Sequence, residues 1–158
     1  MKCCLRPLLG LALVLVLQPV RLAGADQVWR KLRYQGGTIE AKVNPFDWNT
    51  TLRVSGNQLE LTFAGQKTVR IEASQVTALS YGQKAYRRVG DMTALSFLVT
   101  PVALFGMLHK SKDHLIGIQY KAVDGAPGGI LLTVNKDEYA ELLVRLSAIT
   151  GKPVENRP

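Results

Sequence analysis

Short segments in which apolar and polar side chains alternate follow one another along most of the chain. The clearest covers residues 58–63, where Leu59, Leu61 and Phe63 are separated by polar residues. Such alternation is typical of a strand with one face in the core and the other in solvent. It predicts seven strands, at residues 38–43, 51–54, 58–63, 68–72, 76–81, 114–120 and 130–134. They are short and mostly joined by tight turns, which indicates an antiparallel barrel.

Two further segments are predicted not to be strands. Residues 26–37 carry Trp29, Leu32 and Tyr34 among basic residues, and we expect them to form an arm whose aromatic rings pack on the body. Residues 124–129 read Asp-Gly-Ala-Pro-Gly-Gly, a composition of turn-forming residues, and we expect a loop there.

An amphipathic helix is predicted near the end of the chain. Its apolar residues recur at helical spacing and form one stripe, made of Tyr139, Leu142, Leu143, Leu146 and Ile149. Asn135 is suited to cap the start of this helix, and Gly151 is suited to end it. We expect the stripe to pack against one end of the barrel.

Residues 92–108, MTALSFLVTPVALFGML, fit neither pattern, because this stretch of seventeen residues contains no charged side chain. A helix that spans a membrane needs about twenty such residues, and Pro101 would kink a helix here. The predicted strands on both sides belong to one barrel, so a single crossing would separate them. We therefore expect this apolar insert to enter and leave any membrane on the same side.

Three roles remain open for the insert. It could pack on the barrel, associate with a second copy through its small residues, or lie shallowly in a membrane surface between basic flanks. The residues predicted to contact a membrane or a partner are Phe97, Leu98, Val102, Leu104, Phe105, Arg87, Arg88, Lys110 and Lys112.

The first 25 residues have the pattern of a secretory signal peptide. Lys2 and Arg6 precede the apolar run 8–17, and the small residues 23–25 suit a signal peptidase. We expect cleavage before Asp26, which leaves residues 26–158 as a single domain that is exported to the periplasm or the exterior. The two cysteines of the chain lie within the first four residues, so the mature domain would contain none.

The whole chain has a formal charge of +8. Without residues 1–25 it retains 17 basic and 12 acidic residues, a formal charge of +5. A moderately basic exported domain suits an anionic membrane surface or an acidic protein partner better than nucleic acid.

The histidine, serine and acidic residues of the chain are not arranged as in a catalytic site. His109 and His114 are the only histidines, and their spacing of five suits neither one helix face nor one strand face for a metal site. No Gly-x-Ser-x-Gly turn is present, and the acidic residues are scattered. Trp29, Phe46 and Trp48 are expected to cover one end of the barrel. We therefore predict a protein that is not an enzyme and has no cofactor.

Several short runs carry a resemblance to a known family. They are residues 87–90 (Arg-Arg-Val-Gly), 100–104 (Thr-Pro-Val-Ala-Leu), 110–114 (Lys-Ser-Lys-Asp-His), 116–120 (Ile-Gly-Ile-Gln-Tyr) and the closing 146–152. The chain resembles small exported bacterial proteins of unknown function with a pleckstrin-homology-like (PH-like) fold. That resemblance implies a mainly β, partly open barrel of about seven antiparallel strands, a helical apolar insert between strands 5 and 6, and a helix that plugs one end. It implies no activity.

Together these observations predict a non-catalytic, envelope-associated binding module. Its apolar insert and basic flanks would contact a membrane surface or a protein partner, including a second copy. The alternative is a soluble periplasmic carrier of a small apolar ligand.

Overall fold

The computed structural model describes residues 26–64, 67–91 and 114–155. They form an eight-stranded sheet in the order β4-β3-β2-β1-β7-β6-β5-β8, in which all neighbours are antiparallel except β5 and β8. The strands are β1 (Gln27–Gly37), β2 (Thr50–Ser55), β3 (Gln58–Phe63), β4 (Lys67–Glu72), β5 (Val76–Tyr81), β6 (His114–Lys121), β7 (Pro127–Val134) and β8 (Val154–Glu155). A 3-10 turn, η1 (Ala73–Gln75), and the helices α1 (Gln83–Asp91) and α3 (Tyr139–Thr150) complete the fold.

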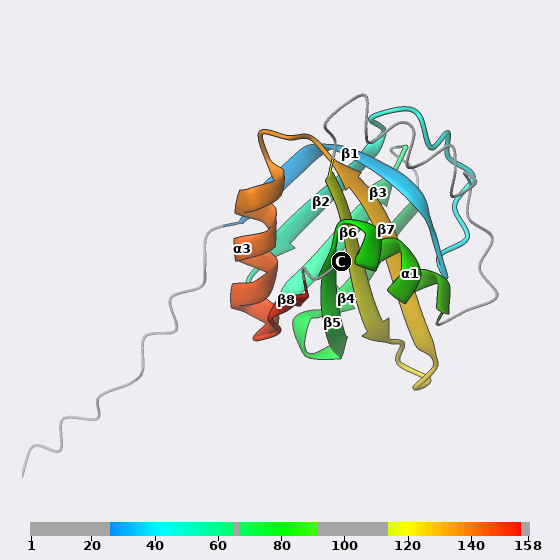
Figure 1. Ribbon diagram of the computed structural model, residues 1–158. Coiled ribbons are helices and arrows are strands. Elements are labelled where there is room, and N and C mark those ends of the chain that lie inside the picture. The colour runs from blue at the N-terminus through cyan, green and yellow to red at the C-terminus, as the bar shows by residue number, and fades with distance from the viewer. Residues whose placement is uncertain (1–25, 65–66, 92–113, 156–158) are drawn as a thin grey trace, which may run out of the picture.

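The inner face of the sheet forms one apolar core. Figure 1 shows the sheet strongly curled, with α3 along one side and α1 across the outer face of β6 and β7. Fully buried side chains of the core include Leu32, Leu52, Leu61, Ile118, Leu132, Leu142 and Leu146. The predicted fold class is therefore confirmed, and five of the predicted strands match β2 to β6 to within one residue.

The arm predicted at residues 26–37 is in fact the longest strand, β1. Its aromatic residues do pack inward, since Trp29 is 4% exposed and Tyr34 is 1% exposed. The register with β2 shifts between Trp29 and Leu32, and the register with β7 shifts between Tyr34 and Gly36. Such bulges break the period of two by which a strand is recognised, and for that reason the prediction was wrong.

The strand predicted at residues 38–43 is not formed. The chain leaves the sheet after Gly37, whose φ of 151° and close approach to the Gly129 carbonyl only a glycine tolerates. Ile39 is nevertheless buried, and its carbonyl accepts a hydrogen bond of 2.7 Å from the Tyr34 hydroxyl. The alternation at 38–43 thus reflects a loop that packs apolar side chains on the core.

The loop predicted at residues 124–129 is shorter than expected, because Pro127, Gly128 and Gly129 extend β7 opposite the end of β6. Glycine is required here by the Tyr120 ring. A Cβ atom at Gly128 would lie 2.4 Å from Cζ of that ring.

The predicted C-terminal helix is confirmed, but it starts later than expected. Asn135 does not cap α3; its side chain accepts a hydrogen bond from the Asp137 amide at 3.0 Å and forms a turn before the helix. Glu138 is the N-cap residue. Gly151 ends the helix as predicted, with a φ of 66° and an N–H that donates to the Ser147 carbonyl.

Helix α1 was not predicted. Its two apolar side chains, Ala85 and Val89, are fully buried against the outer face of the sheet. Glycines allow this contact, because a Cβ atom at Gly117 would lie 3.1 Å from Cα of Ala85, and one at Gly129 would lie 3.1 Å from Val89. The outer face of β6 and β7 is thus a second, smaller packing surface.

Several predictions fall outside the described residues. They concern the signal peptide at 1–25, the apolar insert at 92–108 with its predicted helix, and the basic residues that follow it. The segment follows α1 and precedes β6, and the strand before α1, β5, pairs with β6, with Tyr81 opposite Ile116.

Candidate functional site

A groove of about 780 Å³ lies between α3 and the strands β5 and β8. Its lining is mostly apolar and consists of Tyr81, Tyr139, Leu143, Val144, Ser147, Ala148 and Val154. Because Val144 is 71% exposed, one wall of the groove stands open to solvent. We refer to this feature as the α3 groove.

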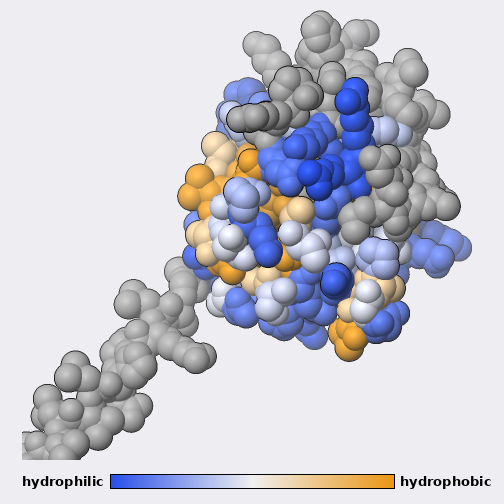
Figure 2. Space-filling view, turned by 60° about the horizontal axis from the view of Figure 1, so that its bottom comes forward, coloured by the Kyte–Doolittle hydropathy of each residue, from blue (hydrophilic) through white to orange (hydrophobic). Residues whose placement is uncertain are grey.

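Helix α3 forms the α3 groove because its apolar surface is wider than the core requires. Leu142 and Leu146 point into the barrel and are fully buried. Leu143 is half-buried, and Val144 faces solvent next to it. Figure 2 shows an apolar surface on the side of the molecule where α3 lies, beside a hydrophilic surface over α1. One face of α3 therefore stabilises the fold, while the adjoining face is left for contact.

A stack of three rings forms one end of the α3 groove. The His114 and Tyr139 rings lie 3.6 Å apart at 16°, and Tyr81 stacks beside both at 5.7 Å. The Tyr81 hydroxyl and Nδ1 of His114 form a hydrogen bond. Burial, and then the proximity of Tyr139, raises the pKa of Tyr81 above its ordinary value. This end of the groove therefore combines aromatic rings with hydrogen-bonding atoms.

Strand β8 forms the opposite wall of the α3 groove. Val154 pairs with Leu79 and Glu155 with Ser80 on the parallel edge of β5. The Glu155 carboxylate accepts from Nζ of Lys84 at 2.6 Å and from the Arg88 guanidinium at 2.5 Å, both on α1. The Lys84 hydrogen bond, together with the charges of Arg88 and Lys84, lowers the pKa of Glu155 below its ordinary value. Glu155 is therefore a carboxylate that links β8 to α1.

Of the residues predicted to contact a membrane or partner, two are described. Arg87 is exposed on α1, and Arg88 is the residue paired with Glu155. The others lie outside the described residues: Phe97, Leu98, Val102, Leu104, Phe105, Lys110 and Lys112. Their contact with a membrane or partner stays a prediction.

The aromatic residues expected to cover one end of the barrel have different environments. Trp29 belongs to the core. Phe46 and Trp48 lie in the loop between β1 and β2 and are 53% and 37% exposed, and the Arg33 guanidinium lies 3.8 Å from the centre of the Trp48 ring. Only Trp29 is thus enclosed by the barrel.

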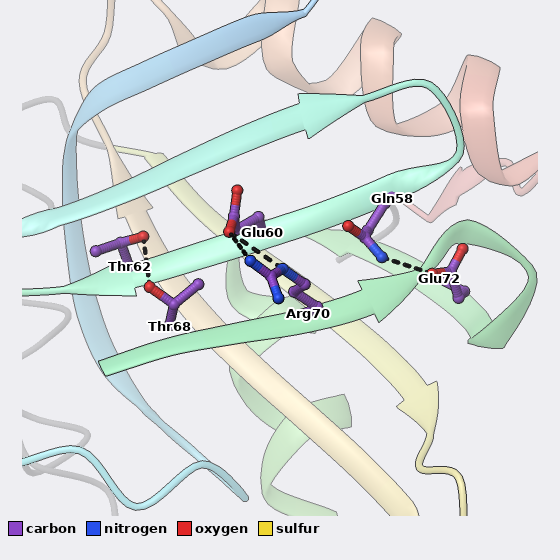
Figure 3. A network of polar contacts seen from close by, with 6 residues as sticks. All are labelled: Gln58, Glu60, Thr62, Thr68, Arg70 and Glu72. Carbon is purple, nitrogen blue, oxygen red and sulfur yellow. Dashed lines mark hydrogen bonds and ion pairs between the residues drawn. The ribbon is translucent and has the colours of Figure 1, made fainter. Parts of the chain in front are cut away.

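The outer faces of β3 and β4 carry a ladder of polar pairs (Figure 3). Gln58 donates to Glu72 at 2.7 Å, Arg70 donates to Glu60 at 3.0 Å, and the hydroxyls of Thr62 and Thr68 lie 3.2 Å apart. These cross-strand hydrogen bonds stabilise the pairing of β3 with β4. Charged side chains on the edge strand β4 also oppose uncontrolled pairing with other sheets.

Within residues 26–64, 67–91 and 114–155, no group of three or more His, Cys, Asp or Glu side chains could hold a metal ion. Neither described helix is long and apolar enough to cross a membrane.

The residues of the α3 groove were largely missed by the sequence analysis. The signal was the run Leu142, Leu143, Val144, since three successive apolar residues exceed what one buried stripe needs. Lys84 and Glu155 could not be paired from sequence, because 71 positions separate them and β8 is only two residues long.

The curled, mostly antiparallel sheet with α3 packed against its core has a PH-like fold. Among solved structures, the chain is similar to one described as the Spt16D Pob3N heterodimer, with 12% identity and a TM-score of 0.51. The match covers 85% of this chain and 56% of that chain, so this chain spans little more than half of its structural neighbour. No protein-family model and no curated protein matches the sequence.

Proposed function

We propose that this chain is a non-catalytic binding module that holds a segment of a partner protein in the α3 groove. The observation that carries the proposal is the apolar lining that α3 provides, where Leu143 is half-buried and Val144 is exposed beside it. Concave, mostly apolar surfaces with a few polar groups are the usual places where proteins bind ligands. The structural neighbour is described as a heterodimer, and protein partnering is therefore within the range of this fold.

The shape of the groove favours a protein segment over a small apolar ligand. Carriers bury most of the surface of a small ligand, typically 70–90% or more. Because Val144 is 71% exposed, the α3 groove is open to solvent at that wall, and it suits a protein segment better than an enclosed molecule.

Site-specific photocrosslinking tests this function. A photoreactive phenylalanine analogue at Val144 should yield a covalent adduct with a partner protein when the chain is expressed in its source cells. Val123, a valine that is 98% exposed in the β6–β7 hairpin, provides the matched control position and should yield none. Equal adducts from both positions, or a small apolar ligand retained in native mass spectrometry, would contradict the proposal.

Export of the mature domain is part of the same proposal. It is supported by the signal-peptide pattern of residues 1–25. An intact-mass measurement on protein from the exported fraction should give a chain that begins at Asp26. A chain that retains Cys3 and Cys4 would contradict it.

Reversible contact with an anionic membrane is a second candidate function. Two observations favour it: Arg87 is exposed on α1 just before the apolar insert, and β5, which precedes α1, pairs with β6, which follows residue 113. Each basic residue near an anionic surface contributes about 1 kcal/mol. The mature protein should therefore float with anionic liposomes, and a Phe97→Ser plus Phe105→Ser variant should float less. A wild-type protein that stays in solution as a folded monomer excludes this function.

A further inference from the structure

Strand β8 is unusual among the strands described because it contains only two residues and runs parallel to its neighbour. It is nevertheless a wall of the proposed binding groove, since Val154 belongs to the lining. β5 has six residues, and only Leu79 and Ser80 pair with β8. The wall therefore covers a small part of that sheet edge.

Two side-chain contacts hold β8 in place. Val154 is half-buried against the core, and Glu155 lies between Lys84 and Arg88. The chain before it is tied to α3, since Oγ of Ser147 donates to the carbonyl of Lys152 at 2.7 Å. The extended pair Val154–Glu155 is thus held by the apolar core, by the edge of β5 and by two cationic side chains of α1.

We propose that β8 is an internal stand-in for a ligand, and that an extended segment of a partner protein, in which an apolar residue is followed by an acidic one, displaces β8 from the edge of β5 beside the α3 groove. The inference rests on the function proposed above. The partner's backbone would pair along the edge of β5, as in β-strand addition, and its side chains would enter the positions of Val154 and Glu155. Charge complementarity defines the partner, because Lys84 and Arg88 both pair with a carboxylate in the structure.

The contacts that hold β8 are weak enough for a partner segment to replace it. Its ion pairs lie at the surface, with the Arg88 side chain 42% and the Glu155 side chain 30% exposed, and such pairs contribute little to stability. A longer partner segment could pair with more of β5 than two residues do. The attachment of β8 to α3 gives it a high effective concentration, and this sets the affinity that a partner must exceed.

A titration followed by nuclear magnetic resonance tests the inference on the mature, ¹⁵N-labelled protein. The probe is a synthetic peptide with the sequence of residues 151–158. In a Val154→Ser plus Glu155→Ser variant, β8 should no longer compete, and the peptide should shift the amide signals of Leu79 to Tyr81. The peptide should bind this variant at least about tenfold more tightly than it binds the wild-type protein.

Charge reversal shows whether the acidic residue is recognised. A peptide in which the glutamate is replaced by lysine should bind the variant about tenfold more weakly. Adding Lys84→Glu and Arg88→Glu to the protein should restore the binding of this lysine peptide. Arg53→Glu, on the exposed side of β2, is the control for net charge and should leave the affinity within about twofold.

Several outcomes overturn the inference. One is a folded variant whose β5 signals do not respond to the peptide; another is a peptide response that does not depend on its glutamate. If the double variant does not fold, Glu155→Lys, which keeps Val154, enters the same titration. A wild-type dimer that dissociates on Glu155→Lys would make a second copy the occupant. If Val144 crosslinks to a partner but the β5 signals do not respond to the peptide, only this inference is refuted. If Val144 gives no crosslink, the proposed function is refuted.

Discussion

The two described helices contact the same sheet in opposite ways. Helix α3 packs with large side chains, Leu142 and Leu146, against the inner core. Helix α1 packs with small ones and comes so close to the outer face that a Cβ atom at Gly117 would lie 3.1 Å from Cα of Ala85. The first contact gains stability from buried area, and the second depends on a precise fit. Only α3 has apolar surface beyond what its own packing uses, and for that reason the α3 groove forms on its side.

The largest difference should appear when the inner contact of α3 is truncated. Leu146→Ala removes a fully buried side chain and should lower the free energy of unfolding by about 2–5 kcal/mol. Val144→Ala, on the exposed face of the same helix, should change it by less than about 0.5 kcal/mol. Urea unfolding measures both; equal costs would mean that α3 does not close the core.

An intermediate effect is expected when the close fit of α1 is disturbed. Gly117→Ala would place a Cβ atom 2.6 Å from Oγ of Ser80 on β5 and 3.1 Å from both Cα and Cβ of Ala85, and it should cost about 1–3 kcal/mol. Gly129→Ala meets only the side chain of Val89, which can adjust, and should cost less. Hydrogen exchange should show the loss of protection concentrated in α1. Unchanged protection of α1 in the Gly117 variant would disprove the close-fit account.

The smallest effect should come from the ion pairs that join α1 to β8. The pKa of Glu155 is lowered in the folded state. The stability that Glu155 contributes is therefore present above pH 4.5, the ordinary pKa of a glutamate, and is lost as the pH falls below that value. Glu155→Gln should therefore slightly lower the melting temperature at pH 7, and the difference from wild type should vanish under acidic conditions. A difference that persists at low pH would show that Glu155 acts otherwise.

The sequence revealed those elements whose periodicity is regular. Strands β2 to β6 and the stripe of α3 follow simple periods, and they were predicted to within a few residues. β1 was missed because two bulges interrupt its alternation, and α1 was missed because Ala85 and Val89 are its only buried apolar side chains. The α3 groove depends on contacts between distant segments, such as Val154 with Leu79, that no local pattern encodes.

The pairing of β1 has a consequence for when the domain can fold. In its second half β1 pairs with β7, with Leu32 opposite Val134, so about a hundred residues must be looped before the first strand gains its second neighbour. Closing such a long loop costs chain entropy, and contacts of this separation slow folding. The meander β1 to β4 can form locally, but its edge at β1 remains unpaired until β7 has been synthesised. Folding of this domain should therefore be a late, slow event that follows translation of nearly the whole chain.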